Sequence, residues 1–416
     1  MNCLWLARDL PFPLDAGDRI YSARLAGALA EAGTTVRFFG FADASPPPSA
    51  PPLNWVAVAG TKRRQAAALF SSLPVAAAIH DTVAYRRALA EQLRERWDAI
   101  VLDSYGSGWA LATCLAARSG TEGKPPLLVY VAHNQEGALW QDLVRNSRAT
   151  PLKRAAIWQN WLKVRALERS LLQHADLTTA ISGEDAAALA ALSSMTAKRP
   201  PLLLTPGYSG TRLAARVIDG NCPRRVVLIG SFRWLVKQEN LRRFVALADP
   251  VFHRHNIAFD VIGDVPQALL DELRPQLRAT VFHGFVEDVA PCFARARMAV
   301  VPEAIGGGFK LKFLDYIFSR LPVATLAAAA AGLPPAIREH LLIRADLAAL
   351  VDAIVAQMDD LDRLNSLQRR AYAAAAQHFD WRERGTALHQ AILACRLEQP
   401  GVATAPPETH YRMELP

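Results

Sequence analysis

Residues 300–315 restrict the fold and function of this chain more than any other stretch, because an apolar run leads there through three glycines into a basic, helix-like segment. Residues 300–302 have the composition of a buried strand, and residues 306–308 are all glycine. Glycines let backbone N–H groups approach a phosphate closely, and the N-terminus of a following helix favours negative charge. Lys310 and Lys312 add positive charge nearby. The pattern predicts an anion site beyond the end of a strand, although turns also use glycine freely.

Short apolar strands alternate with amphipathic helical segments through the first half of the chain, which predicts a parallel, doubly wound α/β sheet. Polar residues just past the ends of such strands, among them Asp103 and His133, are expected to face a ligand. Ser104, at the same strand end as Asp103, fits a helix N-cap as well as a ligand contact. The expected strands are residues 2–6, 35–41, 99–102, 127–131, 176–181 and 200–205, with a helix over residues 22–32.

The second half repeats this alternation after a turn-rich segment, residues 206–225, which we expect to be the linker. The whole chain therefore predicts two Rossmann-like domains that face each other across a cleft. Residues 321–337 are expected to form a buried strand followed by a loop, because prolines and a glycine interrupt this Ala-rich run. The expected strands of this half are residues 226–230, 258–263, 280–284 and 298–302, and the expected helices are residues 239–247 and 386–396.

Length and composition support a two-domain globular protein. At 416 residues the chain exceeds what one hydrophobic core usually supports, and its 51% hydrophobic and 21% charged residues are typical of soluble domains. No apolar run approaches the ~18 residues of a membrane-spanning helix. The apolar N-terminus lacks a basic lead-in and runs into Arg8, Asp9 and Pro11, so we expect a core strand there rather than a signal peptide. Five cysteines without paired spacing favour a reducing, cytoplasmic location.

The formal net charge of +8 favours acidic partners such as nucleotide phosphates, anionic lipids or nucleic acid. Basic residues gather between Arg145 and Arg169 together with Trp158 and Trp161, and we expect one helical stretch there. Such a stretch is typical of a face that binds an anionic membrane. The alternative is a long solvated helix whose apolar side packs inward. Basic and aromatic residues do not interleave in this way elsewhere in the chain, so we expect no nucleic-acid partner.

Several motifs occur in a characteristic order along the chain. In the first half, residues 11–19 form a proline- and glycine-containing loop after the first strand, residues 133–136 are His-Asn-Gln-Glu, and residues 181–185 are Ile-Ser-Gly-Glu-Asp. In the second half, residues 229–232 are Ile-Gly-Ser-Phe and residues 283–286 are His-Gly-Phe-Val. In these motifs and in the glycine-rich segment, the chain resembles the GT-B glycosyltransferases over roughly residues 1–393. More specifically, it resembles the retaining glycosyltransferase family four, also called glycosyl transferases group one.

The resemblance implies that the glycine-rich segment corresponds to a family motif with two glutamates eight positions apart. Asp315 then takes the place of the second carboxylate, which binds the ribose hydroxyls, and Gly307 stands where the first glutamate should be. In the family that first glutamate touches the transferred sugar, so its absence bears on the identity of the donor or on activity itself. A subgroup has a glycine-rich loop and a basic pair instead, which Lys310 and Lys312 fit. Glu303 can also swing into the gap.

The resemblance implies the remaining site residues as well. A sugar would leave a nucleoside diphosphate with retention of anomeric configuration, and cationic groups would stabilise the leaving diphosphate without a metal or another cofactor. The expected catalytic residues are His133, Arg233, Lys237 and Lys312. The expected donor-binding residues are Gly17, Gly230, Ser231, His283, Gly284, Phe285, Glu303, Gly307, Gly308, Phe309, Lys310 and Asp315, and the expected acceptor-side residues are Asp15, Asp103 and Glu136.

On this interpretation residues 1–205 are an acceptor-side domain and residues 206–378 a nucleotide-sugar donor domain. Residues 379–398 are a C-terminal helix that crosses back to the first domain, and residues 399–416 are a disordered tail. The expected partners are a nucleotide-sugar donor, a glycan or glycolipid acceptor and an anionic membrane surface. Two alternatives stay open: a non-catalytic nucleotide-sugar-binding protein of the same fold, and a sugar-nucleotide epimerase of similar fold.

Overall fold

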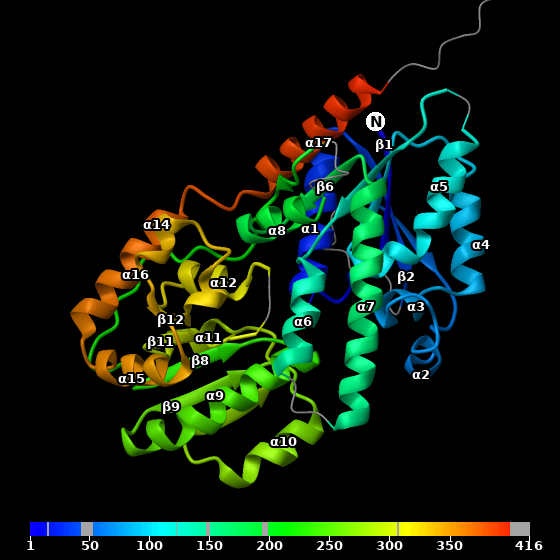
Figure 1. Cartoon of the computed structure of the whole chain (residues 1–416). Helices are drawn as coiled ribbons and strands as arrows, with labels where there is room; N and C mark the ends of the chain where they lie inside the picture. Colours follow the sequence, from blue (N-terminus) through cyan, green and yellow to red (C-terminus); the bar gives the residue numbers. More distant parts are fainter. Residues whose placement is uncertain are drawn as a thin grey trace, which may run out of the picture.

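The computed structural model describes residues 1–14, 16–42, 53–121, 123–146, 150–193, 199–305 and 308–399. Within these residues the chain forms two parallel sheets, each covered by helices (Figure 1). This arrangement confirms the predicted α/β class with two Rossmann-like domains. Within the described residues, no helix combines the length and the apolarity needed to cross a membrane.

The first sheet has the strand order β3-β2-β1-β4-β5-β6-β7, with every neighbouring pair parallel. Its strands are β1 (Asn2–Asp9), β2 (Thr35–Phe41), β3 (Asn54–Val58), β4 (Ala99–Asp103), β5 (Leu127–Val131), β6 (Leu177–Ala180) and β7 (Leu202–Leu203). Its helices are α1 (Gly17–Glu31), α2 (Gln65–Ala68), α3 (Val75–Ala78), α4 (Val83–Gln92), η1 (Tyr105–Ala110), α5 (Leu111–Ser119), α6 (Glu136–Asn146), α7 (Pro151–His174) and α8 (Gly183–Ser193).

Side chains of this sheet alternate between two hydrophobic cores, since successive residues of a strand point to opposite faces. Leu4 and Leu6 of β1 pack with α4, α5 and α7 on one face. Cys3 and Trp5 pack on the other face, against α1. Both faces are therefore apolar, which explains why the central strands have nearly continuous apolar sequences.

The second sheet has the order β10-β9-β8-β11-β12-β13 and is also entirely parallel. Its strands are β8 (Arg225–Ile229), β9 (Ala258–Ile262), β10 (Thr280–Gly284), β11 (Met298–Val301), β12 (Val323–Leu326) and β13 (Leu342–Arg344). Its helices are α9 (Leu235–Arg254), α10 (Gln267–Leu273), η2 (Arg274–Gln276), α11 (Ala290–Ala294), α12 (Lys312–Phe318), α13 (Ala327–Ala330), α14 (Pro335–Arg338), α15 (Leu347–Gln357) and α16 (Leu361–Ala375). Helices α9 and α15 cover one face, and α12 covers the other.

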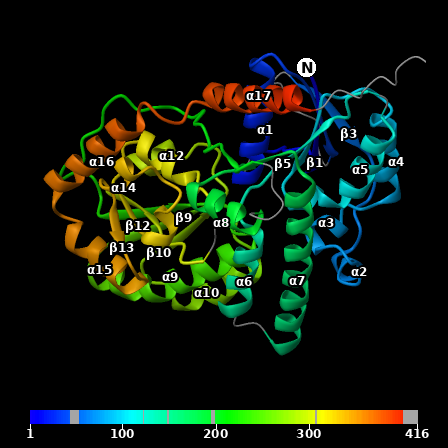
Figure 2. The same ribbon diagram turned by 45° about the horizontal axis from the view of Figure 1, so that its top comes forward.

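The last helix, α17 (Trp381–Glu398), lies along α1 of the first domain (Figure 2). The two helices approach closely at Gly385, where a Cβ atom would stand 2.1 Å from the carbonyl oxygen of Ala28. Trp381 and Leu388 of α17 join the core formed by Cys3 and Trp5. The C-terminal segment thus packs on the N-terminal domain.

A small apolar cluster also joins the two domains. Leu143 of α6 and Ile157 of α7 pack against Val236 of α9 and Ile305, which precedes the glycines. Ile305, at the start of the glycine-rich segment, therefore contacts both domains.

Several expectations need correction. The basic stretch from Arg145 to Arg169 is not one helix: α6 ends at Asn146 and α7 begins at Pro151, because proline fits the first turn of a helix but breaks its interior. After β12, residues 327–338 contain the short helices α13 and α14 rather than a plain loop. Apart from Gln399, the expected disordered tail lies outside the described residues.

Candidate active site

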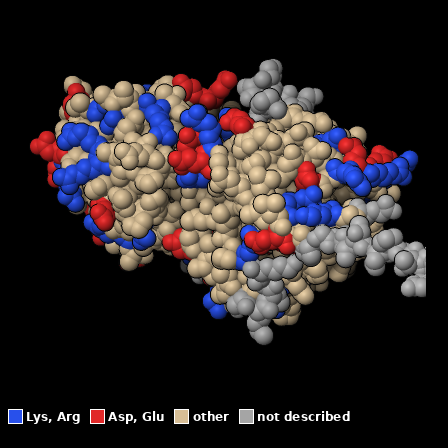
Figure 3. Space-filling view, turned by 90° about the horizontal axis from the view of Figure 1, so that it is seen from above, with Lys and Arg blue, Asp and Glu red and all other residues tan. Residues whose placement is uncertain are grey.

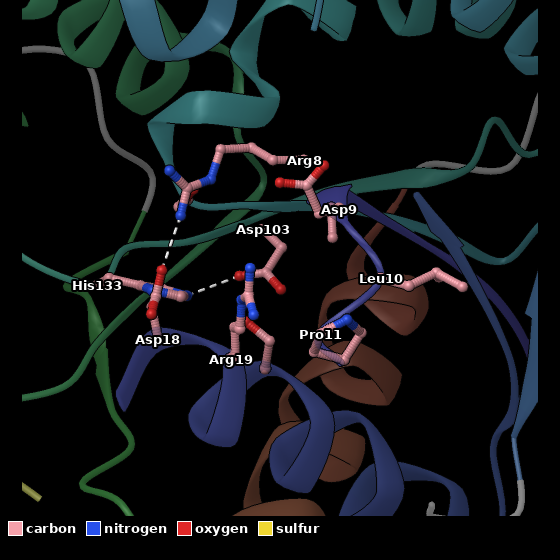
Figure 4. A pocket seen from close by; sticks show the side chains of 11 residues that line it. Arg8, Asp9, Leu10, Pro11, Asp18, Arg19, Asp103 and His133 are labelled. Carbon is pink, nitrogen blue, oxygen red and sulfur yellow. Dashed lines mark hydrogen bonds and ion pairs between the residues drawn. The ribbon is translucent and has the colours of Figure 1, made fainter. Parts of the chain in front are cut away.

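A polar pocket of about 200 Å³ lies beyond the carboxyl ends of β1, β4 and β5 (Figure 4). In a doubly wound sheet this edge is where ligands bind, because neighbouring loops leave a crevice there. Charged side chains of both signs face the pocket, which suits a hydroxyl-rich or charged ligand better than an apolar one. The polar residues that line it are Arg8, Asp9, Asp18, Arg19, Ser22, Asp103, Ser104 and His133.

His133 and Asp103 form a buried pair at the base of this pocket. Nε2 of His133 lies 2.6 Å from Oδ1 of Asp103, and the Trp5 indole donates to Oδ2 at 2.8 Å. Burial opposes protonation of the imidazole, but the charge of Asp103 and its hydrogen bond outweigh burial and raise the pKa of His133. The pair therefore places a readily protonated imidazole beside the pocket.

Arg8 and Asp18 form an ion pair of 2.9 Å across the same pocket, one at the end of β1 and the other in the first turn of α1 (Figure 4). Burial acts to raise the pKa of Asp18, but the charges of Arg8, His133 and Lys237 lower it overall. Lys237 belongs to α9 of the second domain. Asp18 thus experiences charges from both sides of the cleft.

The second domain contributes a cluster of three lysines and one carboxylate. Lys312 donates to Oε1 of Glu303 at 2.5 Å, and its Nζ lies 3.3 Å from where a Cβ of Gly230 would stand. Burial lowers the pKa of Lys310 to about 8, and the neighbouring charges of Lys312 and Lys237 act in the same direction. The same lysines hold the pKa of Glu303 below its usual range in spite of burial. One carboxylate is thus surrounded by three lysines, so the cluster suits a further anion.

Asn240 of α9 holds the start of the glycine-rich segment. Its side-chain oxygen accepts hydrogen bonds from the backbone N–H groups of Ala304 and Ile305, and its amide nitrogen donates to the carbonyl of Ile305 at 2.7 Å. These bonds satisfy backbone polar groups of a partly buried segment that belongs to no helix or strand. Asn240 therefore fixes the backbone next to Glu303.

The two halves of the site meet at Gly308. This residue has φ +71°, and a Cβ there would stand 2.3 Å from Oδ1 of Asn134 and 3.0 Å from the carbonyl oxygen of His133. Glycine is required both by the backbone conformation and by this approach. At a second contact, Gly17 lies against Leu311, whose side chain is 3.4 Å from the position of a Cβ.

Glu136 and Glu168 are two buried acidic residues next to Asn134. Glu168 of α7 accepts hydrogen bonds from the backbone N–H groups of Glu136 and Gly137, so it caps the N-terminus of α6. Asn134 donates to Oε1 of Glu136 at 2.9 Å. Burial raises the pKa of Glu136 to about 7, and repulsion from Glu168 adds to the effect. Glu136, expected on the acceptor side, is 4% exposed.

Other residues expected at the site have separate contacts. Arg233 pairs with Asp264, and its side chain is 67% exposed. His283 contacts Asp260, with 3.0 Å between Nε2 and Oδ1. Phe309 packs against Phe379, with ring centroids 5.7 Å apart.

Of the remaining expected residues, some are described by the structure and others lie outside the described residues. Ser231 lies just beyond Gly230, which follows β8, and is half-buried. Phe285 is 72% exposed just after β10, and Gly284 at the end of β10 has φ +71°. Burial raises the pKa of Asp315, on α12, to about 6. Asp15 and Gly307 lie outside the described residues. The roles predicted for all of these residues stay predictions.

The sequence interpretation missed Arg8 and Asp18 as parts of the site, and it did not foresee the contacts of Asn240. Arg8 follows the apolar part of β1, and Asp18 lies in the first turn of the next helix, so the rule that ligands bind at strand ends could have found both. The contacts of Asn240 gave no such signal, because its partners lie about 65 residues further along the chain. Within the residues that the structure describes, no group of three or more His, Cys, Asp or Glu side chains is arranged to hold a metal ion.

Two family models match the chain in succession. One is described as a Glycosyl transferase 4-like domain and matches residues 17–206. The other is described as Glycosyl transferases group 1 and matches residues 223–360. Among curated proteins, none matches the chain by sequence.

Solved structures resemble the chain over nearly its whole length. The sucrose-phosphate synthase of Thermosynechococcus elongatus has a TM-score of 0.66 and 18% identity, covering 95% of this chain and 99% of that protein. WaaG, a glycosyltransferase involved in lipopolysaccharide biosynthesis, has a TM-score of 0.64 and 17% identity, with coverages of 94% and 99%. Anabaena HepE in complex with UDP and glucose has a TM-score of 0.65 and 13% identity, with coverages of 95% and 100%. At such identities the likeness shows the fold, the GT-B arrangement of two Rossmann-like domains.

Proposed function

Because the chain belongs to the GT-B glycosyltransferases of group 1, we propose that it moves a hexose-type sugar from a nucleoside-diphosphate-sugar donor to a glycan or lipid-linked acceptor. The solved complex of HepE with UDP-glucose supports a nucleotide-sugar donor for a chain of the same fold. WaaG is involved in lipopolysaccharide biosynthesis, which supports an acceptor from polysaccharide or glycoconjugate synthesis for this chain.

The observation that carries this proposal is the position of the lysine cluster opposite the pocket of His133 and Asp103. Gly308 brings the loop of Lys310 and Lys312 against the backbone of His133. A diphosphate on the lysines would thus place its sugar towards the polar pocket of the first domain. An acceptor hydroxyl in that pocket would then reach the anomeric carbon.

The reaction proposed for this site breaks the bond between the anomeric carbon and the diphosphate oxygen. Negative charge grows on the leaving diphosphate, and Lys237, Lys310 and Lys312 stabilise it through charges that the chain itself supplies, without a metal. The acceptor oxygen forms its bond on the same face of the sugar, and the leaving phosphate takes the acceptor proton. The anomeric configuration is retained, and no protein nucleophile is used.

A donor screen in EDTA tests this proposal. Uridine, guanosine and deoxythymidine diphosphate sugars are offered with a glycolipid extract, and binding and turnover are measured for the wild-type chain, Lys312→Ala and His133→Ala. We expect one donor to be turned over by the wild type and turnover to fall at least about 100-fold in both variants. Lys124→Ala is the control, because Lys124 is exposed and contacts the carbonyl of Arg396, far from the site.

A non-catalytic nucleotide-sugar-binding protein is the second candidate, because glycine occupies position 307, where the family has a glutamate. Tight binding of one nucleoside diphosphate without turnover of any donor would favour it. Turnover that needs added divalent metal would contradict the metal-free part of the proposal. An epimerase would instead change the sugar of the donor without consuming acceptor.

We also propose that the protein works at the cytoplasmic surface of a membrane, bound through α7. Leu152, Trp158 and Leu162 of this helix are 83%, 51% and 39% exposed. The helix also carries five cations, Lys153, Arg154, Lys163, Arg165 and Arg169, whereas its one carboxylate, Glu168, is buried. Apolar side chains among cations without exposed acids suit an anionic bilayer.

A further exposed apolar side chain, Phe70, lies next to this helix. Phe70 is 92% exposed, and the preceding Leu69 accepts a hydrogen bond from Lys163 at 2.7 Å. By contrast, basic and acidic side chains are interspersed on the face of the molecule that includes α17 (Figure 3). The charge and apolar character favour the α7 side for the membrane.

Flotation with liposomes tests the membrane proposal. We expect binding to vesicles that contain anionic lipid, weaker binding at high salt, and loss of most binding in Leu152→Glu. Leu397→Glu is the matched control, because Leu397 is 82% exposed but lies on α17. Equal flotation of the two variants would refute the assignment to α7.

A further inference from the structure

Glu303 presents a carboxylate oxygen that the described residues leave without a partner. The residue follows β11 and is 7% exposed. Its Oε1 accepts from Lys312 at 2.5 Å. Its Oε2 is buried and has no hydrogen-bond partner among the described residues.

The unpartnered oxygen carries a free-energy cost. A buried acceptor without a donor costs about 1–3 kcal/mol, and more when the group is charged. Glu303 is charged at neutral pH, because Lys312, Lys310 and Lys237 hold its pKa below the usual range despite burial. The lysines compensate the charge of the group, but they leave the hydrogen-bonding capacity of Oε2 unused. A ligand hydroxyl that donates to Oε2 would recover this cost.

The position of the carboxylate is fixed before any ligand arrives. Asn240 holds the backbone of Ala304 and Ile305, the two residues that follow Glu303. Lys312 stands against Gly230 at the end of β8 and restrains the other oxygen. The carboxylate thus lies at the carboxyl ends of β8 and β11, on the side where the proposed donor binds.

We propose that Glu303 is a specificity-determining residue, whose Oε2 accepts a hydrogen bond from one hydroxyl of the transferred sugar. This inference rests on the proposed function. When the diphosphate arrives, it competes with Glu303 for Lys312, which then turns towards the phosphate oxygens. Sugars that carry the hydroxyl are accepted, and analogues that lack it leave the buried carboxylate oxygen unpaired and are rejected.

The competition for Lys312 separates this role from that of a simple counter-ion. If Glu303 only held Lys312 in place, its loss would weaken binding of a nucleoside diphosphate and of the complete donor alike. If Glu303 binds the sugar, Glu303→Gln leaves the affinity for the nucleoside diphosphate unchanged or improves it. The same variant lowers kcat/KM for the complete donor.

The experiment compares the wild type, Glu303→Gln and Glu303→Ala with the donor that the screen identifies and with its monodeoxy analogues. We expect removal of one particular hydroxyl to lower kcat/KM of the wild type about 100-fold or more, but to have little effect in Glu303→Ala and an intermediate one in Glu303→Gln. Affinity for the corresponding nucleoside diphosphate is measured for each variant by calorimetry. Thermal unfolding of each variant checks that it is folded.

The possible outcomes separate the inference from the function on which it rests. If no nucleoside diphosphate binds the wild type, the proposed function fails and the role of Glu303 fails with it. If a donor is turned over but every monodeoxy analogue loses the same factor in the wild type and in both variants, only the role of Glu303 is overturned. Parallel losses of nucleoside diphosphate affinity and turnover in Glu303→Gln would reduce Glu303 to a counter-ion and also overturn it.

Discussion

The Nε2 atom of His133 lies 2.6 Å from Oδ1 of Asp103, and the other oxygen of this carboxylate is held by the indole of Trp5. The contact joins the ends of β4 and β5, and Trp5 adds β1. Both oxygens of Asp103 are thus engaged, and the carboxylate holds the imidazole of His133 beside the pocket.

Replacing Asp103 with Asn tests this pair. The pKa of His133 is raised in the folded state, so the stabilisation from its charged form is fully present below the ordinary pKa of about 6.5 and is lost as the pH rises through the raised value. We expect Asp103→Asn to lose about 2 kcal/mol of unfolding free energy at pH 5.5, and less at pH 9. Urea unfolding at both values measures the difference. A loss of equal size at both would contradict a charged pair.

The central strands could be predicted because both faces of a parallel sheet are buried, which gives β1, β2, β4 and β5 continuous apolar sequences. Strand β3 escaped prediction because it lies at the sheet edge and is mostly exposed or half-buried. Helix α9 was predicted too short, since it continues through Pro250 to Arg254. Burial of Phe252 beyond the proline shows that packing overrides the local preference.

The site was partly predictable for a different reason. His133 follows the end of β5, and that position alone indicates a ligand. Lys312 begins α12 after the glycine-rich loop, and that sequence pattern predicted an anion site. The pairing of Lys312 with Glu303 depends on how the loop between these two residues folds back. The hydrogen bonds between Asn240 and Ile305 join residues far apart in sequence. Such contacts leave no local periodicity, so they emerge only from the folded chain.

The carboxyl group of Glu136 makes the stability depend on pH in the opposite sense from a surface acid. Burial and Glu168 raise its pKa to about 7, so the folded state favours the protonated form, and this preference is lost as the pH rises through 7. Between pH 5 and pH 8, we expect the unfolding free energy of Glu136→Gln to rise by about 3 kcal/mol relative to that of the wild type. Glu184→Gln, on the exposed first turn of α8, serves as the control in urea unfolding. A gain that is equal at both pH values would contradict the raised pKa.

Asn240 and Asn365 form a matched pair in the second domain. Each is a buried helical asparagine that binds the backbone of a distant segment, Asn240 at Ile305 and Asn365 at Ile218. We expect either Ala variant to lose about 2–3 kcal/mol of unfolding free energy. Only Asn240→Ala should also lower kcat/KM, by roughly tenfold or more, because its bonds hold the loop of Glu303. Equal kcat/KM in the two variants would show that the loop does not need this restraint.

If the proposed donor binds at the lysine cluster, we expect Lys310 to make its affinity depend on pH. Burial, together with the charges of Lys312 and Lys237, lowers its pKa to about 8, so the ammonium is mostly charged at pH 7 and mostly neutral at pH 9. We expect affinity for the nucleoside diphosphate found in the screen to fall about tenfold over this range, since one of three cations is lost. Arginine stays charged throughout, so Lys310→Arg should flatten the dependence, whereas Lys310→Met should bind weakly at both pH values. Calorimetric titration at each pH measures the affinities. If the affinity of Lys310→Met for the nucleoside diphosphate still fell between pH 7 and pH 9, the titration would belong to another group. This result would contradict the role of Lys310 as the pH-sensitive cation of the cleft.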